Sequence, residues 1–389
     1  MVQYLLRHPL VLAVGSEKGG EGAETHLLDA SEALRAQPDG FKGGVLFNRL
    51  GRAHGTGSLG DVLAVQQELV RTRLAAREDP MSAVRIAREG VVVHYTPHYM
   101  FVPGLPGAIC DLSRAAGGAP CAELRYLVML REPASRAVSS WWYHHRRGAL
   151  ADAVADGARA LRALEKCYSG AGVDFLELCA SVHRKSRGAG DGAAAAGGGG
   201  GGGGDLGKFS EHTEKLSACS DALLVTGGDN AGFSAHVGKS LYAHQLVHWF
   251  ARLPLGQFYI MALEDYGAAP LREFTQLLCW LGLAAVDEHG IRGFRDREAI
   301  AAELAVHYNT APITHDAEVN EIAPVRQTLL DLFDPQNRAL EVLLSGSAAP
   351  ADDGVASWAR VRQVLLRSRD EQTRDRRCWD VGRSPGAER

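Results

Sequence analysis

The stretch Leu124–Gly148, LRYLVMLREPASRAVSSWWYHHRRG, decides the fold class of this 389-residue chain. Residues 124–130 form an apolar run with the length of a buried strand, and 134–145 then have the pattern of a helix. Arg131 follows the expected strand at its carboxyl end, and Pro133 suits the first turn of the helix. Ligands of an α/β sheet bind at this edge, where a helix N-terminus offers free N–H groups and a positive dipole end. The stretch therefore predicts a strand–helix unit with an anion site at its junction.

Two side chains of this stretch have the chemistry to hold an anion. Arg131 carries a forked, permanently charged guanidinium. Ser139, about two turns into the expected helix, adds a hydroxyl. The alternative interpretation is that this stretch binds no anion. Arg-x-Pro after a strand is also simply a favourable helix start, and Arg136 and Arg146 would then lie on a solvated face of the helix.

The same alternation of strands and helices continues on both sides of this stretch. Strands alternating with helices favour a parallel sheet covered by helices on both faces, so we expect an α/β fold. The further expected elements are a helix at 66–89, a strand at 90–95, a helix at 240–253, a strand at 258–263, a helix at 271–281 closed by Gly282, and a helical pair at 326–344 broken at Asp334-Pro335.

One low-complexity segment interrupts this pattern. Residues 187–204 read RGAGDGAAAAGGGGGGGG, and glycine offers nothing to bury while losing the most entropy on ordering. Because the parts before and after it look incomplete alone, we expect a flexible insert at 187–207 within a single domain over 1–345. Residues 346–389 are rich in Ala, Pro and Asp and then in Arg, and we expect a loosely held tail there.

Bulk composition excludes several classes of protein. An apolar content of 46% indicates a globular protein, and a net charge of -4 gives no basic excess for nucleic acid. The seven cysteines are scattered without metal-ligand spacing, so the sequence indicates neither a metal site nor a disulfide framework. Distant cysteines can still meet in a fold, so the compartment stays open. No window approaches the roughly 20 apolar residues of a membrane span. The apolar N-terminus is interrupted by Arg7, His8 and Pro9, so we expect it to belong to the fold and not to a signal peptide.

The junction at 130–139 also carries a family resemblance. Its string Leu-Arg-x-Pro-x-x-Arg-Ala-x-Ser closely resembles the 3′-phosphate-binding motif of sulfotransferases that use PAPS, 3′-phosphoadenosine 5′-phosphosulfate. The resemblance implies that Arg131 and Ser139 hold the 3′-phosphate of this co-substrate. It also implies an α/β fold of the kind found in P-loop NTPases, and a reaction without a metal.

The resemblance extends along most of residues 1–345 outside the insert and the loop at 41–58. Residues 240–254 are similar to the Ser-x-Tyr…Leu…Trp…Phe-Pro helix of the family. The strand ending at Glu264-Asp265 and the helix running into Trp280-Leu281-Gly282-Leu283 follow in the expected order, and 329–344 resemble the closing helical segment. Each similarity is weak alone, and their order is what favours the family.

A catalytic segment is implied near the N-terminus. Residues 24–29, Glu-Thr-His-Leu-Leu-Asp, resemble the Glu-x-His-Phe-Phe-Asp signature of the carbohydrate (heparan-sulfate) branch, whose glutamate is the general base. The resemblance implies Glu24 as the base that deprotonates the acceptor, with His26 as its support or as an alternative base. A solvated carboxylate in a loop and a histidine bonded beneath the sheet are the alternative interpretations.

Two departures from the family pattern matter for function. His94-Tyr95-Thr96-Pro97-His98-Tyr99 stands where the family has Glu-Lys-Thr-Pro-x-Tyr, so a neutral phenol replaces a cation. Val2–Pro9 resembles the end of the helix that follows the family's Lys-x-Gly-Thr-Thr phosphosulfate loop. We therefore expect the first strand and this loop to lie before Met1, in a sequence truncated at its N-terminus.

The sequence favours an enzyme that transfers a sulfuryl group from PAPS to a hydroxyl or amine of a heparan-like glycan, in the Golgi lumen by resemblance. One alternative is a non-catalytic remnant that binds a 3′-phosphonucleotide. The other is a relative of P-loop kinases, although no Walker lysine occurs and Glu264-Asp265 is the one candidate acidic strand end.

Overall fold

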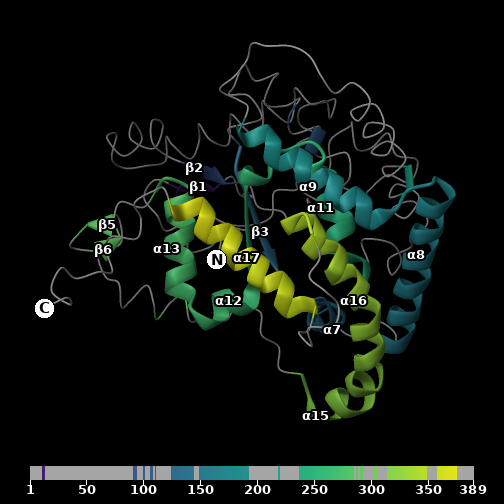
Figure 1. Ribbon diagram of the computed structural model, residues 1–389. Helices are drawn as coiled ribbons and strands as arrows, with labels where there is room; N and C mark the ends of the chain where they lie inside the picture. Colours follow the sequence, from purple (N-terminus) through teal and green to yellow (C-terminus); the bar gives the residue numbers. More distant parts are fainter. Residues whose placement is uncertain are drawn as a thin grey trace, which may run out of the picture.

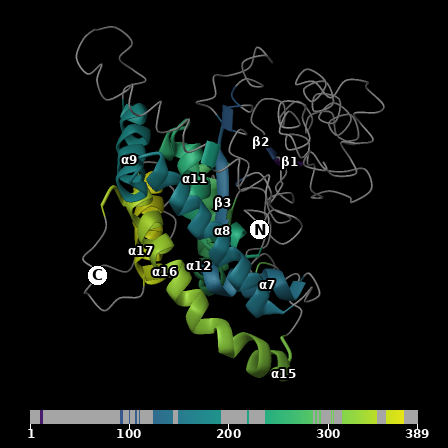
Figure 2. The same cartoon turned by 90° about the vertical axis from the view of Figure 1, so that its right-hand side faces the viewer.

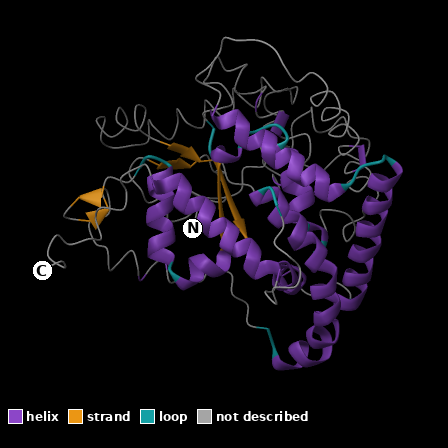
Figure 3. Cartoon of the chain, viewed as in Figure 1, coloured by secondary structure: helices purple, strands orange, loops and turns teal. Residues whose placement is uncertain are grey.

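The computed structural model shows a mostly helical α/β protein (Figures 1 and 3). Glu24, His26, the stretch 94–99 and the expected helix at 66–89 lie outside the described residues. The structure describes residues 11–13, 91–93, 100, 106–107, 110, 124–143, 149–191, 218–219, 236–283, 286–287, 290–291, 302, 304, 313–347 and 357–374.

Parallel strand pairs form the sheet part of the fold. Strand β3 (Tyr126–Leu130) pairs in parallel with β4 (Phe258–Ala262), so that Tyr126 faces Phe258 and Leu130 faces Ala262. Strands β1 (Val11–Ala13) and β2 (Val91–Val93) form a second parallel pair, while β5 (Val286–Asp287) and β6 (Gly290–Ile291) are antiparallel. The parallel pairing confirms the α/β expectation, and β2 and β4 lie where strands were predicted.

Helices occupy most of the remaining described chain. They are α7 (Pro133–Tyr143), α8 (Leu150–Gly170), α9 (Phe175–Asp191), α11 (Tyr242–Phe250), α12 (Leu263–Ala268), α13 (Pro270–Trp280), α15 (His315–Ala317), α16 (Ala323–Ser345) and α17 (Ser357–Arg374), with 3-10 turns at Gly238–Ser240 and Leu255–Gln257 and a π-helical turn at Glu318–Ile322. The predicted helix at 271–281 is confirmed as α13, and Gly282 ends it with a φ of 76° that favours glycine.

The β3–β4 pair is covered on both faces. Phe258, Ile260 and Ala262 of β4 belong to a large apolar cluster with residues of α7, α8, α9, α11, α16 and α17. Tyr259 and Met261, which alternate with them, belong to a second cluster with residues of α13. Figure 1 shows α8, α9 and α16 on one side of β3, with α12 and α13 on the other. All five residues of β4 are buried, whereas β3 is fully buried only at Leu130, so the prediction of a buried strand at 124–130 is only partly met.

Two predicted boundaries differ from the structure. Helix α9 continues to Asp191, so residues 187–191 are helical and not part of a flexible insert. Helix α16 runs unbroken through Pro335, which corrects the expected break there. An internal proline costs a helix about 3 kcal/mol. Along α16, burial of Phe333, Leu340 and Leu343 offsets this cost.

Helix α17 lies in the segment that the sequence analysis expected to be a loose tail. Trp358, Val361 and Leu365 are buried in the large cluster, and α17 packs against β4, α13 and α16. Figure 2 shows α17 beside α16, consistent with this packing. For residues 357–374 the expectation of a loose tail is therefore wrong. The apolar positions recur at helical spacing, and the many charged residues between them hid the pattern.

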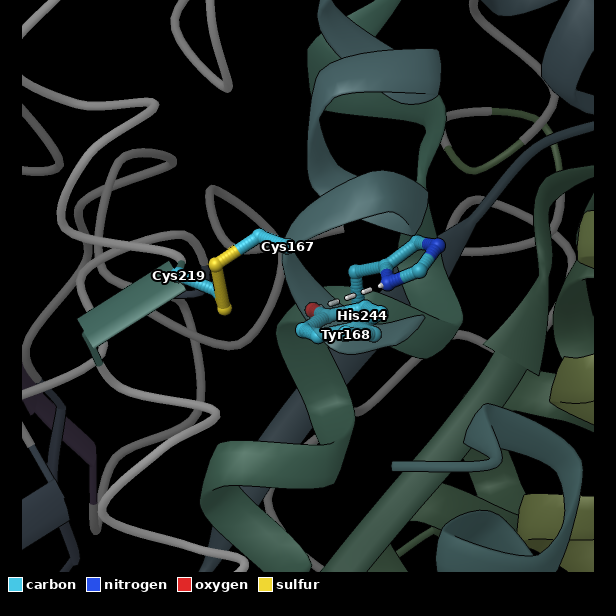
Figure 4. The surroundings of a disulfide bond; sticks show 4 residues. All are labelled: Cys167, Tyr168, Cys219 and His244. Atoms are coloured by element: carbon cyan, nitrogen blue, oxygen red, sulfur yellow. Dashed lines mark hydrogen bonds between the residues drawn. A yellow bond between two sulfur atoms is a disulfide. The ribbon is translucent and has the colours of Figure 1, made fainter. Parts of the chain in front are cut away.

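A disulfide joins Cys167, in the last turn of α8, to Cys219 across 52 residues (Figure 4). Cys110 and Cys279 are also disulfide-bonded, while Cys179 is free and buried. The expectation of no disulfide framework is corrected. Scattered spacing gave no hint of it, because the cysteines meet only through the fold.

Candidate functional site

The junction of β3 and α7 has the geometry that the sequence predicted. Arg131 follows the last residue of β3, and α7 begins at Pro133. Strand β4 ends beside it, so Glu264 at the start of α12 reaches across: the backbone N–H of Glu132 donates to Oε1 of Glu264 at 2.8 Å. Carboxyl ends of two parallel strands thus meet at one edge, the position where α/β sheets bind ligands.

The N-terminus of α7 is capped by its own sequence. The Glu132 carboxylate accepts the backbone N–H of Ala134 at 2.9 Å and that of Ser135 at 2.6 Å. The prediction of free N–H groups is therefore wrong for these two donors, because an adjacent carboxylate satisfies them and complements the helix dipole. An anion at this junction has to be held mainly by side chains.

Arg131 and Ser139 are the side chains available for that role. Both are half-buried, and within the described residues neither the Arg131 guanidinium nor the Ser139 hydroxyl has a partner. Helix α7 buries Ala134, Ala137, Val138 and Trp141 against the core, so Ser139 lies off its buried face. It lies six residues beyond the start of α7, about 9 Å along the axis. The structure keeps both predicted residues on one short unit, β3–α7.

The backbone of Arg131 is fixed by a buried tyrosine. The hydroxyl of Tyr242 donates to the carbonyl oxygen of Arg131 at 3.0 Å and accepts its N–H at 3.4 Å. Burial raises the pKa of Tyr242 to about 12, with the charges of Glu264 and Glu132 adding to the rise and Arg136 opposing it. Tyr242 therefore stays protonated and keeps its donor at neutral pH.

A second guanidinium lies near the junction. Burial lowers the pKa of Arg136, and the like charge of Arg131 lowers it further while Tyr242 raises it. Its Nη1 donates to the carbonyl oxygen of His236 at 3.3 Å, and His236 Nδ1 lies 3.0 Å from the Ser140 hydroxyl. Arg136 is thus not on a freely solvated face, and it adds a second guanidinium to a junction that also holds the carboxylates of Glu132 and Glu264.

Sequence reasoning missed a buried ionic cluster next to the junction. Arg369 of α17 pairs with Asp265 at 3.3 Å and with Glu273 at 2.8 Å, and all three are at least 97% buried. Arg362 also pairs with Asp265. No sequence signal pointed to this cluster, because about 100 residues separate Asp265 from its partners in α17.

The remaining predicted site residues belong to segments that the structure does not describe. Glu24 and His26 lie outside the described residues, as does Tyr95, so their roles stay predictions. In the part of the chain that the structure describes, no group of His, Cys, Asp or Glu could hold a metal ion. None of the described helices combines the length and the apolar character needed to cross a membrane.

Comparison with known proteins gives no neighbour, since no family model, curated protein or solved structure matches the chain.

Proposed function

We propose that this protein is a PAPS-dependent sulfotransferase with a P-loop-NTPase-like α/β fold, which transfers a sulfuryl group to a hydroxyl or amine of a glycan. The observation that carries the proposal is the junction at 130–139. The motif Leu-Arg-x-Pro-x-x-Arg-Ala-x-Ser spans the end of a strand and the helix that follows, with Arg131 and Ser139 both unpartnered among the described residues.

The chemistry of the junction fits a phosphate monoester. A guanidinium binds phosphate through two parallel N–H donors, and a serine hydroxyl adds a third. Because the Glu132 carboxylate accepts two N–H groups of α7, these groups are not available to a phosphate. The electrostatic attraction of a phosphate to this junction then has to come from the guanidinium groups of Arg131 and Arg136. The 3′-phosphate of PAPS, and of its product 3′,5′-ADP, is a ligand of this kind.

In this proposal Glu24 is the general base that removes the proton of the acceptor as the sulfuryl group is transferred, and His26 supports it or replaces it. Sulfuryl transfer needs such a base and needs positive charge where the leaving phosphate gains negative charge. The heparan-like acceptor and the catalytic roles rest on the resemblance of residues 24–29 to the carbohydrate branch of the family.

The proposal also places the protein in an oxidising compartment such as the Golgi lumen. The Cys167–Cys219 bond and the disulfide-bonded state of Cys110 and Cys279 support this part. Disulfides persist in the secretory pathway and are rare where glutathione keeps thiols reduced.

Calorimetric titration with 3′,5′-ADP and with 5′-AMP, which lacks the 3′-phosphate, tests the binding half of the proposal. We expect 3′,5′-ADP to bind more tightly than 5′-AMP. Arg131→Ala should weaken 3′,5′-ADP binding by about tenfold or more, because a charge-assisted hydrogen bond contributes about 1.5–3 kcal/mol. Arg159→Ala is the matched control, since Arg159 is exposed on α8 and, among the described residues, pairs with Asp156 one turn earlier. Equal affinity for the two nucleotides, or no binding of either, would contradict the proposal.

Transfer from radiolabelled PAPS to desulfated heparan tests the catalytic half. We expect the full-length protein to incorporate the label, and its Glu24→Gln variant to lose this activity while it still binds 3′,5′-ADP. Binding without transfer would instead favour a protein that binds a 3′-phosphonucleotide and has no transferase activity, because Arg131 and Ser139 bear on binding alone.

A further inference from the structure

We infer that Tyr242 and Glu264 are positioning residues that hold the backbone of Arg131 and Glu132 in the conformation that binds a 3′-phosphate. The inference rests on the function proposed above. It concerns two side chains that do not touch the nucleotide and act through the residue that does.

The contacts come from two directions. Tyr242 of α11 uses one hydroxyl for both backbone groups of Arg131, donating to the carbonyl oxygen at 3.0 Å and accepting from the N–H at 3.4 Å. Glu264 of α12 accepts the N–H of the next residue, Glu132, at 2.8 Å. Three consecutive backbone groups are therefore fixed by side chains 111 and 132 residues away in sequence. Polar contacts of this separation cannot arise from local helix or strand formation.

Both positioning side chains are themselves held. Tyr242 is buried, and its ring lies 6.4 Å from that of Trp358 in α17. Glu264 precedes Asp265, which pairs with Arg369 and Arg362 of α17. Helix α17 thus supports both contacts, and the backbone at 131–132 lies between elements that have little freedom to move.

The electrostatic state of the two groups suits this role. Because burial raises the pKa of Tyr242 to about 12, its hydroxyl remains a donor across the physiological range. Within the described chain, Oε2 of Glu264 is shielded from solvent and has no hydrogen-bond partner, so Oε1 makes the only polar contact of this carboxylate. A buried oxygen without a partner costs free energy, so the hydrogen bond of Oε1 with the Glu132 N–H is the contact that stabilises this carboxylate in place.

The geometry matters because no side chain among the described residues contacts the Arg131 guanidinium and orients it. The direction in which its guanidinium extends is then set by its backbone and its packing. Binding groups must be held within about 0.5 Å of the productive position, so a loosened peptide at 131–132 weakens the contact of Arg131 with phosphate.

The experiment compares Tyr242→Phe, Glu264→Ala and Glu264→Gln with the wild type in titrations with 3′,5′-ADP and 5′-AMP. Tyr242→Phe removes two neutral hydrogen bonds with the Arg131 backbone and should weaken 3′,5′-ADP binding roughly fivefold or more. Glu264→Ala removes one hydrogen bond to a charged group and should weaken it roughly tenfold or more. Glu264→Gln keeps an acceptor oxygen for Glu132 and should recover most of the affinity. Binding of 5′-AMP should stay unchanged, which a general loss of structure would not allow.

Tyr266→Phe is the matched control. Tyr266 is buried in α12, two residues after Glu264, and its hydroxyl makes no hydrogen bond among the residues that the structure describes. It should bind both nucleotides like the wild type. The inference is overturned if Tyr242→Phe and Glu264→Ala bind 3′,5′-ADP as tightly as Tyr266→Phe does, or if they lose both nucleotides equally.

Amide hydrogen exchange separates this inference from the proposed function. If the wild type binds no 3′,5′-ADP, the proposed function fails while the positioning contacts remain testable. Exchange at residues 131 and 132 should speed up in Tyr242→Phe and Glu264→Ala, and stay unchanged in Tyr266→Phe. Unchanged exchange in all three variants would overturn the positioning role itself.

Discussion

Replacing either half of the Cys167–Cys219 disulfide should lower the free energy of unfolding by about 4 kcal/mol. The bond closes a loop of 52 residues, and the loop-closure relation gives a reduction of about 14 cal/mol/K in the entropy of the unfolded state. At 25 °C this corresponds to about 4 kcal/mol. The effect is large for a domain, whose whole stability is about 5–15 kcal/mol.

The assay is urea unfolding of Cys167→Ser, Cys219→Ser and the double variant, followed by circular dichroism. Because each single change already removes the bond, the double variant should be only slightly less stable than either single one. Cys179→Ala is the control, since it removes a buried thiol that forms no disulfide and leaves the loop closed. A loss below about 1 kcal/mol, or single effects that add in the double variant, would refute the loop-closure reasoning.

Two further predictions concern packing and pH. Gly157→Ala should destabilise the protein by about 1–2 kcal/mol in the same urea assay, because a Cβ at this position clashes with the Val237 side chain. The cost of this clash exceeds the free energy that the higher helix propensity of alanine contributes. A gain in stability would contradict the close approach of α8 to Val237. Burial lowers the pKa of His244 to about 4, despite the hydrogen bond with Gln336, so below its unfolded pKa of about 6.5 the unfolded state takes up a proton that the folded state does not. The free energy of unfolding should therefore fall as the pH drops from 6.5 towards 4. In His244→Gln this free energy should depend less steeply on pH across the same window. An equal dependence in the variant and the wild type would show that His244 does not cause the loss of stability.

Local sequence signals predicted the elements that local physics determines. The strand at β4, the start of α7 at Pro133 and the end of α13 at Gly282 each depend on a few neighbouring residues. The predicted placement of Arg131 at the end of a strand succeeded for the same reason.

Long-range contacts account for what the sequence did not predict. The capping of α7 by Glu132 depends on one rotamer, and any of several carboxylates could have taken that place. Helix α8 was not predicted, although its buried Val154, Leu161 and Leu164 recur at helical spacing, because glycine and alanine dilute the pattern. The disulfide and the cluster around Asp265 require residues that only the folded chain brings together.

The position of α17 in the chain also sets an order of events during synthesis. Asp265 leaves the ribosome about 100 residues before Arg362 and Arg369, the two cations of α17 that pair with it in the finished protein. Until then, burying Asp265 would leave uncompensated charge at a cost of several kcal/mol, whereas Glu273 has an ion pair with its sequence neighbour Arg272. At about 5–20 residues per second the nascent chain waits several seconds in this state. The edge of the sheet that carries Glu264 can therefore complete its packing only after α17 has been made, which exposes the unfinished protein to chaperones for that interval.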